Sequence, residues 1–185
     1  MASKIKVDQL ETADGTGTIA LQNQLSGMTY ASMPSGSIIQ VVTLSRQRTS
    51  SLTTSSQSYV TLNDGVGDFE LSITPKFSNS SIWGIVSIPG VAKRTTNSSA
   101  QFTVFKGSSA LRKLDSHYGY HTQGSSNNIA GIDNFTCHWV EDNVGTTNAT
   151  TYTMKVNTTG GEVKVFDTHA STDVYSTMTL MEVKA

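Results

Sequence analysis

The sequence predicts an all-β protein: an antiparallel β-sandwich, or jelly roll, preceded by an extended N-terminal arm. Short runs rich in β-branched and aromatic residues recur from residue 38 onwards. Turn-forming Gly, Asn and Ser separate these runs at short intervals. No segment of about ten residues has the apolar spacing of an amphipathic helix. Because parallel strands need helical crossovers, we expect antiparallel sheets joined by hairpin-like turns.

Residues 1–35 form the predicted arm and residues 36–185 the predicted sandwich domain. In the arm, residues 4–10 alternate polar and apolar side chains as a strand does, residues 14–17 carry a turn signal, and residues 18–21 resume the strand pattern. Large apolar side chains are too few here to form a core, so the arm needs the surface of another molecule to become ordered. The expected docking anchors are Ile5, Val7, Leu10, Ile19 and Leu21.

The strands of the sandwich are predicted from apolar runs bounded by turn signals. Residues 69–73 show the pattern clearly, because alternation points Phe69, Leu71 and Ile73 to one face. Residues 46–58 are polar, and we expect an exposed loop or a weak edge strand there. The predicted strands are residues 38–44, 59–62, 69–73, 80–88, 100–105, 134–140, 151–156, 162–166 and 177–183.

Aromatic and long aliphatic residues within these runs are predicted to form the core. The single cysteine, Cys137, is expected as a small core residue, and one cysteine cannot form a disulfide within the chain. The core candidates are Trp83, Phe102, Phe105, Phe135, Trp139, Tyr152, Phe166 and Leu180.

Composition and charge exclude several classes of partner. Charged residues make up only 15% of the 185 residues, and the net charge is -1. Lys and Arg are spread along the chain, so no surface that neutralises phosphates is predicted and nucleic acid is not an expected partner. No apolar run approaches the roughly 20 residues that span a bilayer, and the N-terminus lacks the apolar region of a secretory signal. We expect a protein made in the cytoplasm without membrane insertion.

Four phrases of the sequence carry a resemblance to a known family. They are the N-terminal Ser-Lys-Ile-Lys-Val-Asp-Gln tag at residues 3–9, the linked residues 71–75 and 80–86, the strand and turn at residues 102–107, and the C-terminal strand at residues 176–183. In this order they resemble small virion and tail-fibre-like structural proteins of marine bacteriophages. Each phrase alone is generic β sequence, but together they cover both ends and the middle of the chain.

The resemblance implies a jelly-roll head that forms a homotrimer in the virion. It implies that the N-terminal segment docks on another virion protein, with the chain made in the host cytoplasm. It leaves open whether the protein is a tail fibre or appendage, or a capsid decoration. This sequence departs from the family pattern in residues 111–131, which match no family phrase. We expect this insertion to carry a particle-specific or host-specific surface.

The sequence predicts no enzyme site. His117 and His121 would share one face of a helix, but the glycines around them argue against a helix. Cys137 and His138 are adjacent, and adjacent strand residues point to opposite faces, so they cannot form a nucleophile and base pair. No zinc-protease, phosphate-loop or serine-hydrolase motif occurs. We expect no catalytic residue, no bound metal and no cofactor.

The sequence supports two functional hypotheses from different classes. The leading hypothesis is a non-enzymatic structural protein of a bacteriophage virion. The alternative is a carbohydrate-binding, lectin-like module, including a receptor-binding role at a host surface glycan, because jelly rolls often serve as lectins. Such a module needs exposed aromatic side chains on a loop, and the candidate recognition residues are His117, Tyr118, Tyr120 and His121.

Overall fold

The computed structural model describes residues 29–93, 99–117, 130–166 and 175–185. The chain divides into two compact units, Met1–Met33 and Pro34–Ala185. In the first unit the described residues include the short 3-10 turn η2 (Tyr30–Ser32). The second unit contains all of the described strands.

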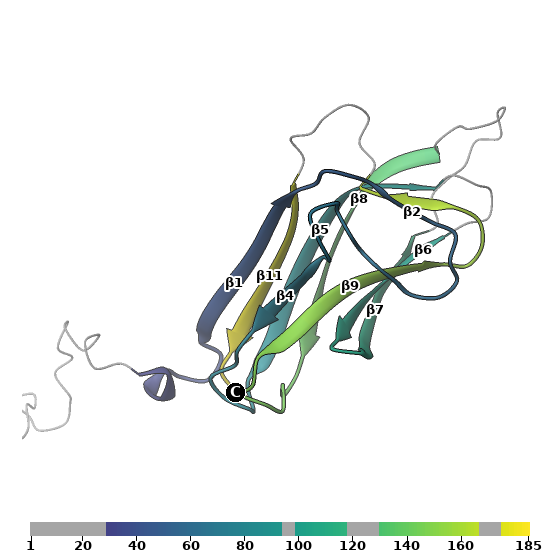
Figure 1. Ribbon diagram of the computed structural model, residues 1–185. Coiled ribbons are helices and arrows are strands. Elements are labelled where there is room, and N and C mark those ends of the chain that lie inside the picture. The colour runs from purple at the N-terminus through teal and green to yellow at the C-terminus, as the bar shows by residue number, and fades with distance from the viewer. Residues whose placement is uncertain (1–28, 94–98, 118–129, 167–174) are drawn as a thin grey trace, which may run out of the picture. The chain divides into compact units, whose positions relative to one another are not determined.

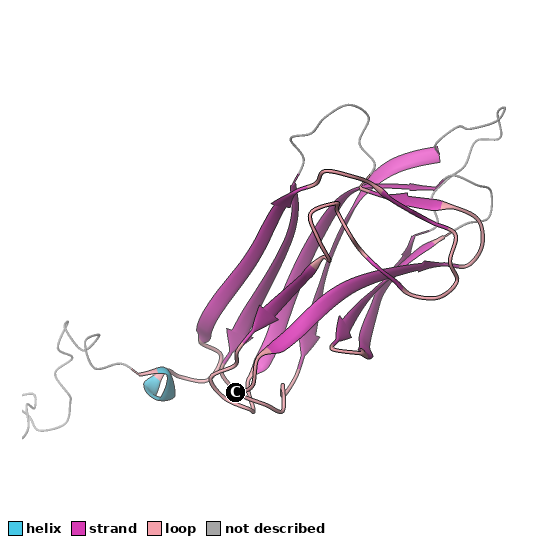
Figure 2. Cartoon of the chain, viewed as in Figure 1, coloured by secondary structure: helices cyan, strands magenta, loops and turns pink. Residues whose placement is uncertain are grey.

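Two antiparallel sheets form the second unit, which confirms the predicted β-sandwich (Figure 1). Figure 2 shows strands throughout this unit, joined by loops and turns. The first sheet contains β1 (Ile38–Gln47), β2 (Leu52–Thr54), β5 (Ser81–Lys93), β8 (Ala130–Glu141), β10 (Val163–Val165) and β11 (Tyr175–Val183). The second contains β3 (Val60–Thr61), β4 (Glu70–Ile73), β6 (Ala100–Lys106), β7 (Ser109–His117) and β9 (Thr150–Thr158).

Each sheet is organised around one long central strand. In the first sheet β8 pairs with one edge of β5, while β11 and then β10 pair with the other edge, and β1 follows β11. In the second sheet β9 pairs with β6 on one side and with β3 and β4 on the other, and β7 follows β6. In β5 the register with β8 shifts between Ile88 and Val91, where Pro89 supplies no N–H and Gly90 has a φ of 68°.

The core lies between the two sheets because side chains alternate along each strand. In β11, buried and partly buried residues alternate from Ser176 to Val183. Aromatic rings fill much of the interior: Phe102 stacks on Phe135 with ring centroids 4.2 Å apart. The largest fully buried side chains are Trp139, Tyr152, Phe69, Phe102, Phe166, Leu62, Ile73, Ile82, Ile88, Met154, Met178 and Leu180.

Most of the sequence-based expectations for the sandwich are confirmed. Each predicted strand is present, and the polar residues 46–58 contain the short strand β2. Every predicted core aromatic is buried except Trp83, and Leu180 is buried as well. Cys137 is partly buried and packs against the core. Part of the insertion expected at residues 111–131 is regular sheet, because residues 111–117 belong to β7, which pairs with β6 as far as His117.

Candidate interaction surface

The outward-facing side chains of β8, β5, β11 and β1 form a broad surface, which we name the outer face. Its register across the four strands follows from the cross-strand pairs. None of its described residues is Asp, Glu, Lys or Arg. They are Asn134, Thr136, His138 and Val140 of β8; Ser81, Trp83, Ile85 and Ser87 of β5; Tyr175, Thr177, Thr179, Met181 and Val183 of β11; and Ile38, Val41, Thr43, Ser45 and Gln47 of β1.

Apolar side chains line up in one row across the outer face. The register places Val140 beside Trp83, Trp83 beside Met181, and Met181 beside Val41. Trp83 is 47% exposed and Val41 is 54% exposed. Ile85, which is 44% exposed, extends the apolar area into the next row. Large apolar side chains at this exposure, side by side, mark a surface suited to burial by another molecule.

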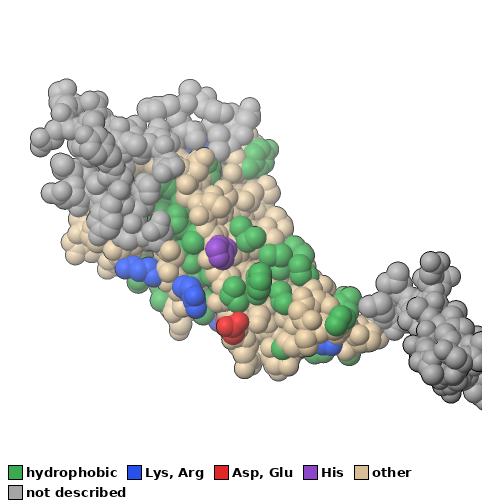
Figure 3. All heavy atoms as spheres, turned by 180° about the vertical axis from the view of Figure 1, so that it is seen from behind, with side chains coloured by type: hydrophobic (Ala, Val, Ile, Leu, Met, Phe, Trp, Pro, Cys, Tyr) green, Lys and Arg blue, Asp and Glu red, His purple; other side chains and the backbone are tan. Residues whose placement is uncertain are grey.

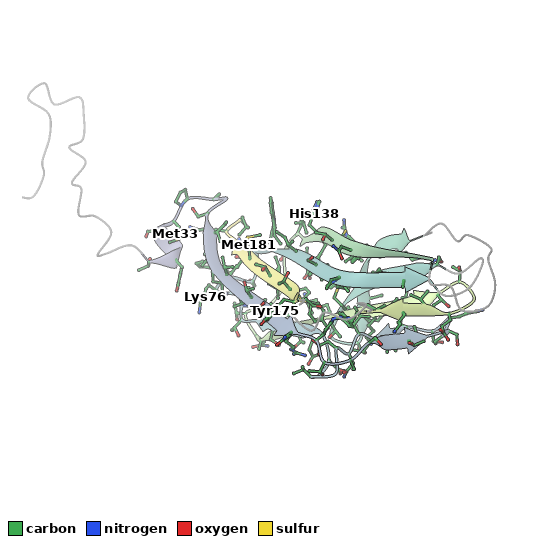
Figure 4. All side chains as sticks on the ribbon, turned by 90° about the horizontal axis from the view of Figure 1, so that it is seen from above. Met33, Lys76, His138, Tyr175 and Met181 are labelled. Carbon is green, nitrogen blue, oxygen red and sulfur yellow. The ribbon has the colours of Figure 1, made fainter. Side chains whose placement is uncertain are left out.

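The view from behind shows the same arrangement. In Figure 3 hydrophobic side chains gather around one histidine in the middle of the face, with Lys, Arg and acidic side chains toward the margin. In Figure 4 His138 points away from the opposite sheet. His138 is exposed while Cys137 packs against the core, so the two side chains point to opposite faces as the strand pattern predicts.

The position of Trp83 differs from the one that its sequence pattern predicts. It was predicted in the core, but in β5 the inward positions belong to Ile82, Gly84 and Val86. Successive strand residues point to opposite faces, so burial of Ile82 forces Trp83 outward. The signal was present in the sequence: residues 82–86 are apolar on both faces of the strand, a pattern typical of strands covered on both sides.

Two carboxylates, the partly buried Glu141 and the fully buried Glu182, make hydrogen bonds that tie elements of the sandwich together. Glu141 accepts hydrogen bonds from Lys106 Nζ (2.5 Å) and from the hydroxyl of Tyr152 (2.5 Å). Burial first, and then the hydrogen bond with Glu141, raises the pKa of Tyr152 above its ordinary value. The phenol therefore stays a proton donor, and both carboxylate oxygens are engaged. This group ties β8 to the second sheet rather than presenting a free base to a substrate.

Glu182 of β11 has a comparable role on the other flank of β5, with Ile82 between it and Glu141 in the register. Its carboxylate accepts the backbone N–H of Lys76 at 2.8 and 2.9 Å and that of Phe77 at 3.1 Å. Gln40 Nε2 donates a further bond at 2.6 Å. Glu182 is fully buried, so these donors replace the water it loses. The carboxylate thereby fixes the turn between β4 and β5.

The sequence-predicted site residues fall largely outside the described residues. The docking anchors Ile5, Val7, Leu10, Ile19 and Leu21 lie there, as do Tyr118, Tyr120 and His121 of the possible recognition loop. The backbone of His117 ends β7. Within the described residues, no three His, Cys, Asp or Glu side chains come together as a metal ion would require. The described chain also contains no helix with the length and apolar character needed to cross a membrane.

Comparison with known proteins finds similarity to solved structures only, two of which are structures of infectious bursal disease virus. No protein-family model and no curated protein sequence matches the chain. A structure of infectious bursal disease virus, Gt strain, matches with a TM-score of 0.39 and 11% identity, over 80% of this chain and 39% of that chain. The Gx strain matches with a TM-score of 0.32 and 12% identity, over 78% of this chain and 36% of that chain. The chain thus spans under two fifths of the length of these structures, and TM-scores this low carry no argument about function.

Proposed function

We propose that this chain is a non-enzymatic structural protein of a bacteriophage virion. In this proposal residues 1–35 attach the chain to another virion protein, and the sandwich forms a homotrimeric head. The observation that carries the proposal is the outer face, a four-stranded surface without a charged side chain among its described residues and with Trp83, Ile85 and Val41 exposed. Exposed apolar side chains grouped on one surface are typical of proteins that bind other proteins. The resemblance of four phrases of the sequence to virion proteins of marine bacteriophages supports a phage particle in this proposal.

The attachment proposed for the arm is strand addition. An extended segment that alternates polar and apolar residues, such as residues 4–10, completes an exposed sheet edge of its partner through backbone hydrogen bonds, and its apolar side chains enter pockets. Three arms on one trimer act together, so weak single contacts give strong overall attachment. The division of the chain at Met33 is compatible with this separation of tasks.

The test replaces the anchors in the full-length chain. A variant with serine at Ile5, Val7, Leu10, Ile19 and Leu21 should keep its oligomeric state and disappear from purified particles. The matched control puts serine at polar positions of the same segment, Lys4, Lys6, Asp8, Gln9 and Thr18, and should incorporate normally. Quantitative mass spectrometry of purified particles measures both. Incorporation of the anchor variant at the parental level would refute the docking role.

The same measurement separates the two placements in the virion. Tens of copies per particle indicate a tail fibre or appendage, and hundreds indicate a capsid decoration. Absence of the parent protein from purified particles would reject the virion role altogether.

A further inference from the structure

The two sheets differ in how far their outward apolar side chains are covered by the chain itself. On the second sheet Phe105 is covered by its own chain: the ring of Tyr59 packs against it at 5.0 Å, and Lys155 Nζ lies 4.3 Å from its centroid. Phe105 is therefore only 6% exposed, whereas Trp83 on the outer face remains 47% exposed. The outer side of the second sheet also carries Glu70 and Lys155. The second sheet thus covers Phe105, whereas the outer face of the first sheet leaves Trp83 and Ile85 exposed.

Two pairs of hydroxyl side chains of the outer face bond to each other across the strands, whereas Ser81 Oγ donates to the carboxylate of Asp142 at the margin of the face at 3.4 Å. Thr43 Oγ1 and Thr179 Oγ1 are 3.2 Å apart, and Ser87 Oγ and Thr136 Oγ1 are 3.2 Å apart. A hydroxyl that already has a protein partner loses less when water is removed. The hydroxyl-rich part of the outer face can therefore be covered together with its apolar row.

The size of the outer face matches a small specific interface. Four strands about 4.8 Å apart and about nine residues long span roughly 19 by 30 Å, or about 570 Å². Around a three-fold axis each face is shared between two neighbours, so three such faces bury about 1,700 Å² in a trimer, which is the size of one specific interface. Aromatic residues and methionine are typical of interface centres, and charged residues are depleted there. Trp83, Tyr175 and Met181 on an uncharged surface fit this composition.

The absence of charge on the described outer face favours a second copy of this chain as the occupant. A charged partner would find no complementary group there and would lose the hydration of its own charges. Two identical uncharged faces meet without like-charge repulsion. Hydroxyl groups and apolar side chains are then matched by the same kinds of group from the other copy.

We infer that the outer face of β8, β5, β11 and β1 is the contact between copies of this chain, with the row of Val140, Trp83, Met181 and Val41 at its centre. This inference rests on the proposed function, because it assigns a surface to the trimer proposed there. It goes beyond the proposed function in naming the surface, because the homotrimer proposed there leaves open which face of the sandwich meets the other copies. Another virion protein on this face would be a different assignment.

The test introduces one charge into the outer face of the full-length protein. Ile85→Glu and Ile85→Lys place opposite charges at the same point, and Val41→Glu repeats the change on another strand. Each of these changes removes an apolar contact from the interface, so it should raise the dissociation constant of the oligomer about 30-fold or more. The matched control, Ala110→Glu, puts a charge on an exposed position of β7 in the second sheet. Light scattering after size-exclusion chromatography measures the mass, and circular dichroism checks that each variant is folded.

The inference expects an oligomeric parent, an oligomeric Ala110→Glu control, and folded monomers for all three outer-face variants. Both signs of charge should act alike, because the penalty is desolvation rather than a specific ion pair. A monomeric parent at micromolar concentration would overturn the inference, and so would folded outer-face variants with the parental mass. In either case the incorporation test of the anchor variant stands independently, so a failed contact between copies is distinguishable from a failed virion role.

Discussion

Gly84 is the position where a single methyl group should test the packing of the sandwich most sharply. It lies on the inward side of β5 and pairs in register with Trp139 of β8. A Cβ atom at Gly84 would lie 2.1 Å from Cζ2, 2.3 Å from Cε2 and 2.4 Å from Cη2 of the Trp139 ring. The ring therefore lies directly over the glycine backbone, and Gly84→Ala puts a methyl group where the indole already is.

The cost of Gly84→Ala follows from how little the ring can move. Carbon atoms pack at about 3.5–4.0 Å, so the indole would have to retreat by about 1.5 Å. Trp139 is only 2% exposed, and the ring of Tyr152 lies behind it at 6.3 Å. Overpacking of a filled core costs about 1–3 kcal/mol, and this contact belongs at the upper end. Alanine regains about 0.5–1 kcal/mol of strand propensity, which leaves a net loss of about 2–2.5 kcal/mol.

Denaturation in urea, followed by far-ultraviolet circular dichroism at one protein concentration, measures this loss. Trp139→Ala alone should cost about 3–5 kcal/mol, because it leaves a cavity. In that background the Gly84→Ala methyl group enters free space, so the double variant should be at least about 2 kcal/mol more stable than the sum of the single changes predicts. The control Gly67→Ala, whose Cβ would meet only Arg46 Nη1 at 3.4 Å, should stay within about 0.5 kcal/mol of the parent. A neutral Gly84→Ala, or additive single changes, would refute the packing argument.

The hydrogen bonds of Glu182 and Glu141 give further predictions. Glu182→Gln should lower the free energy of unfolding by about 2–3 kcal/mol, because an amide NH₂ then faces backbone N–H donors, whereas Glu70→Gln on the exposed side of β4 should be nearly neutral in the same urea titration. Tyr152→Phe should cost about 1–3 kcal/mol, because it leaves one oxygen of Glu141 without its donor. Because the pKa of Tyr152 is raised in the folded protein, the phenol ionises at about pH 10 only in the unfolded chain. The contribution of this phenol to the free energy of unfolding is therefore complete below that pH and is lost as the pH rises above it. The parent should therefore lose more stability than Tyr152→Phe between about pH 9 and pH 11, and parallel curves would contradict this assignment.

The candidate surface could be predicted only in part from the sequence. Apolar residues on both sides of β5 indicate a strand whose two faces are both covered. They do not indicate which face packs against the core and which contacts a partner. The uncharged character of the outer face emerges only when the register brings together β8, β5, β11 and β1. Strands β1 and β11 are far apart in the chain, so no local sequence pattern indicates that they pair.

Local chemistry in the sequence determined the strands, the turns between them and the all-β class. Period-2 alternation and β-branched runs depend on neighbouring residues, which is why nearly every strand and most core aromatics were predicted correctly. Tertiary structure alone decided that Trp83 faces outward, that Gly84 makes room for Trp139, and that Glu182 holds the turn after β4. Each of these depends on a partner distant in the sequence. Alternation supplies two faces for every strand, but only the packing of the two sheets selects the face that is buried.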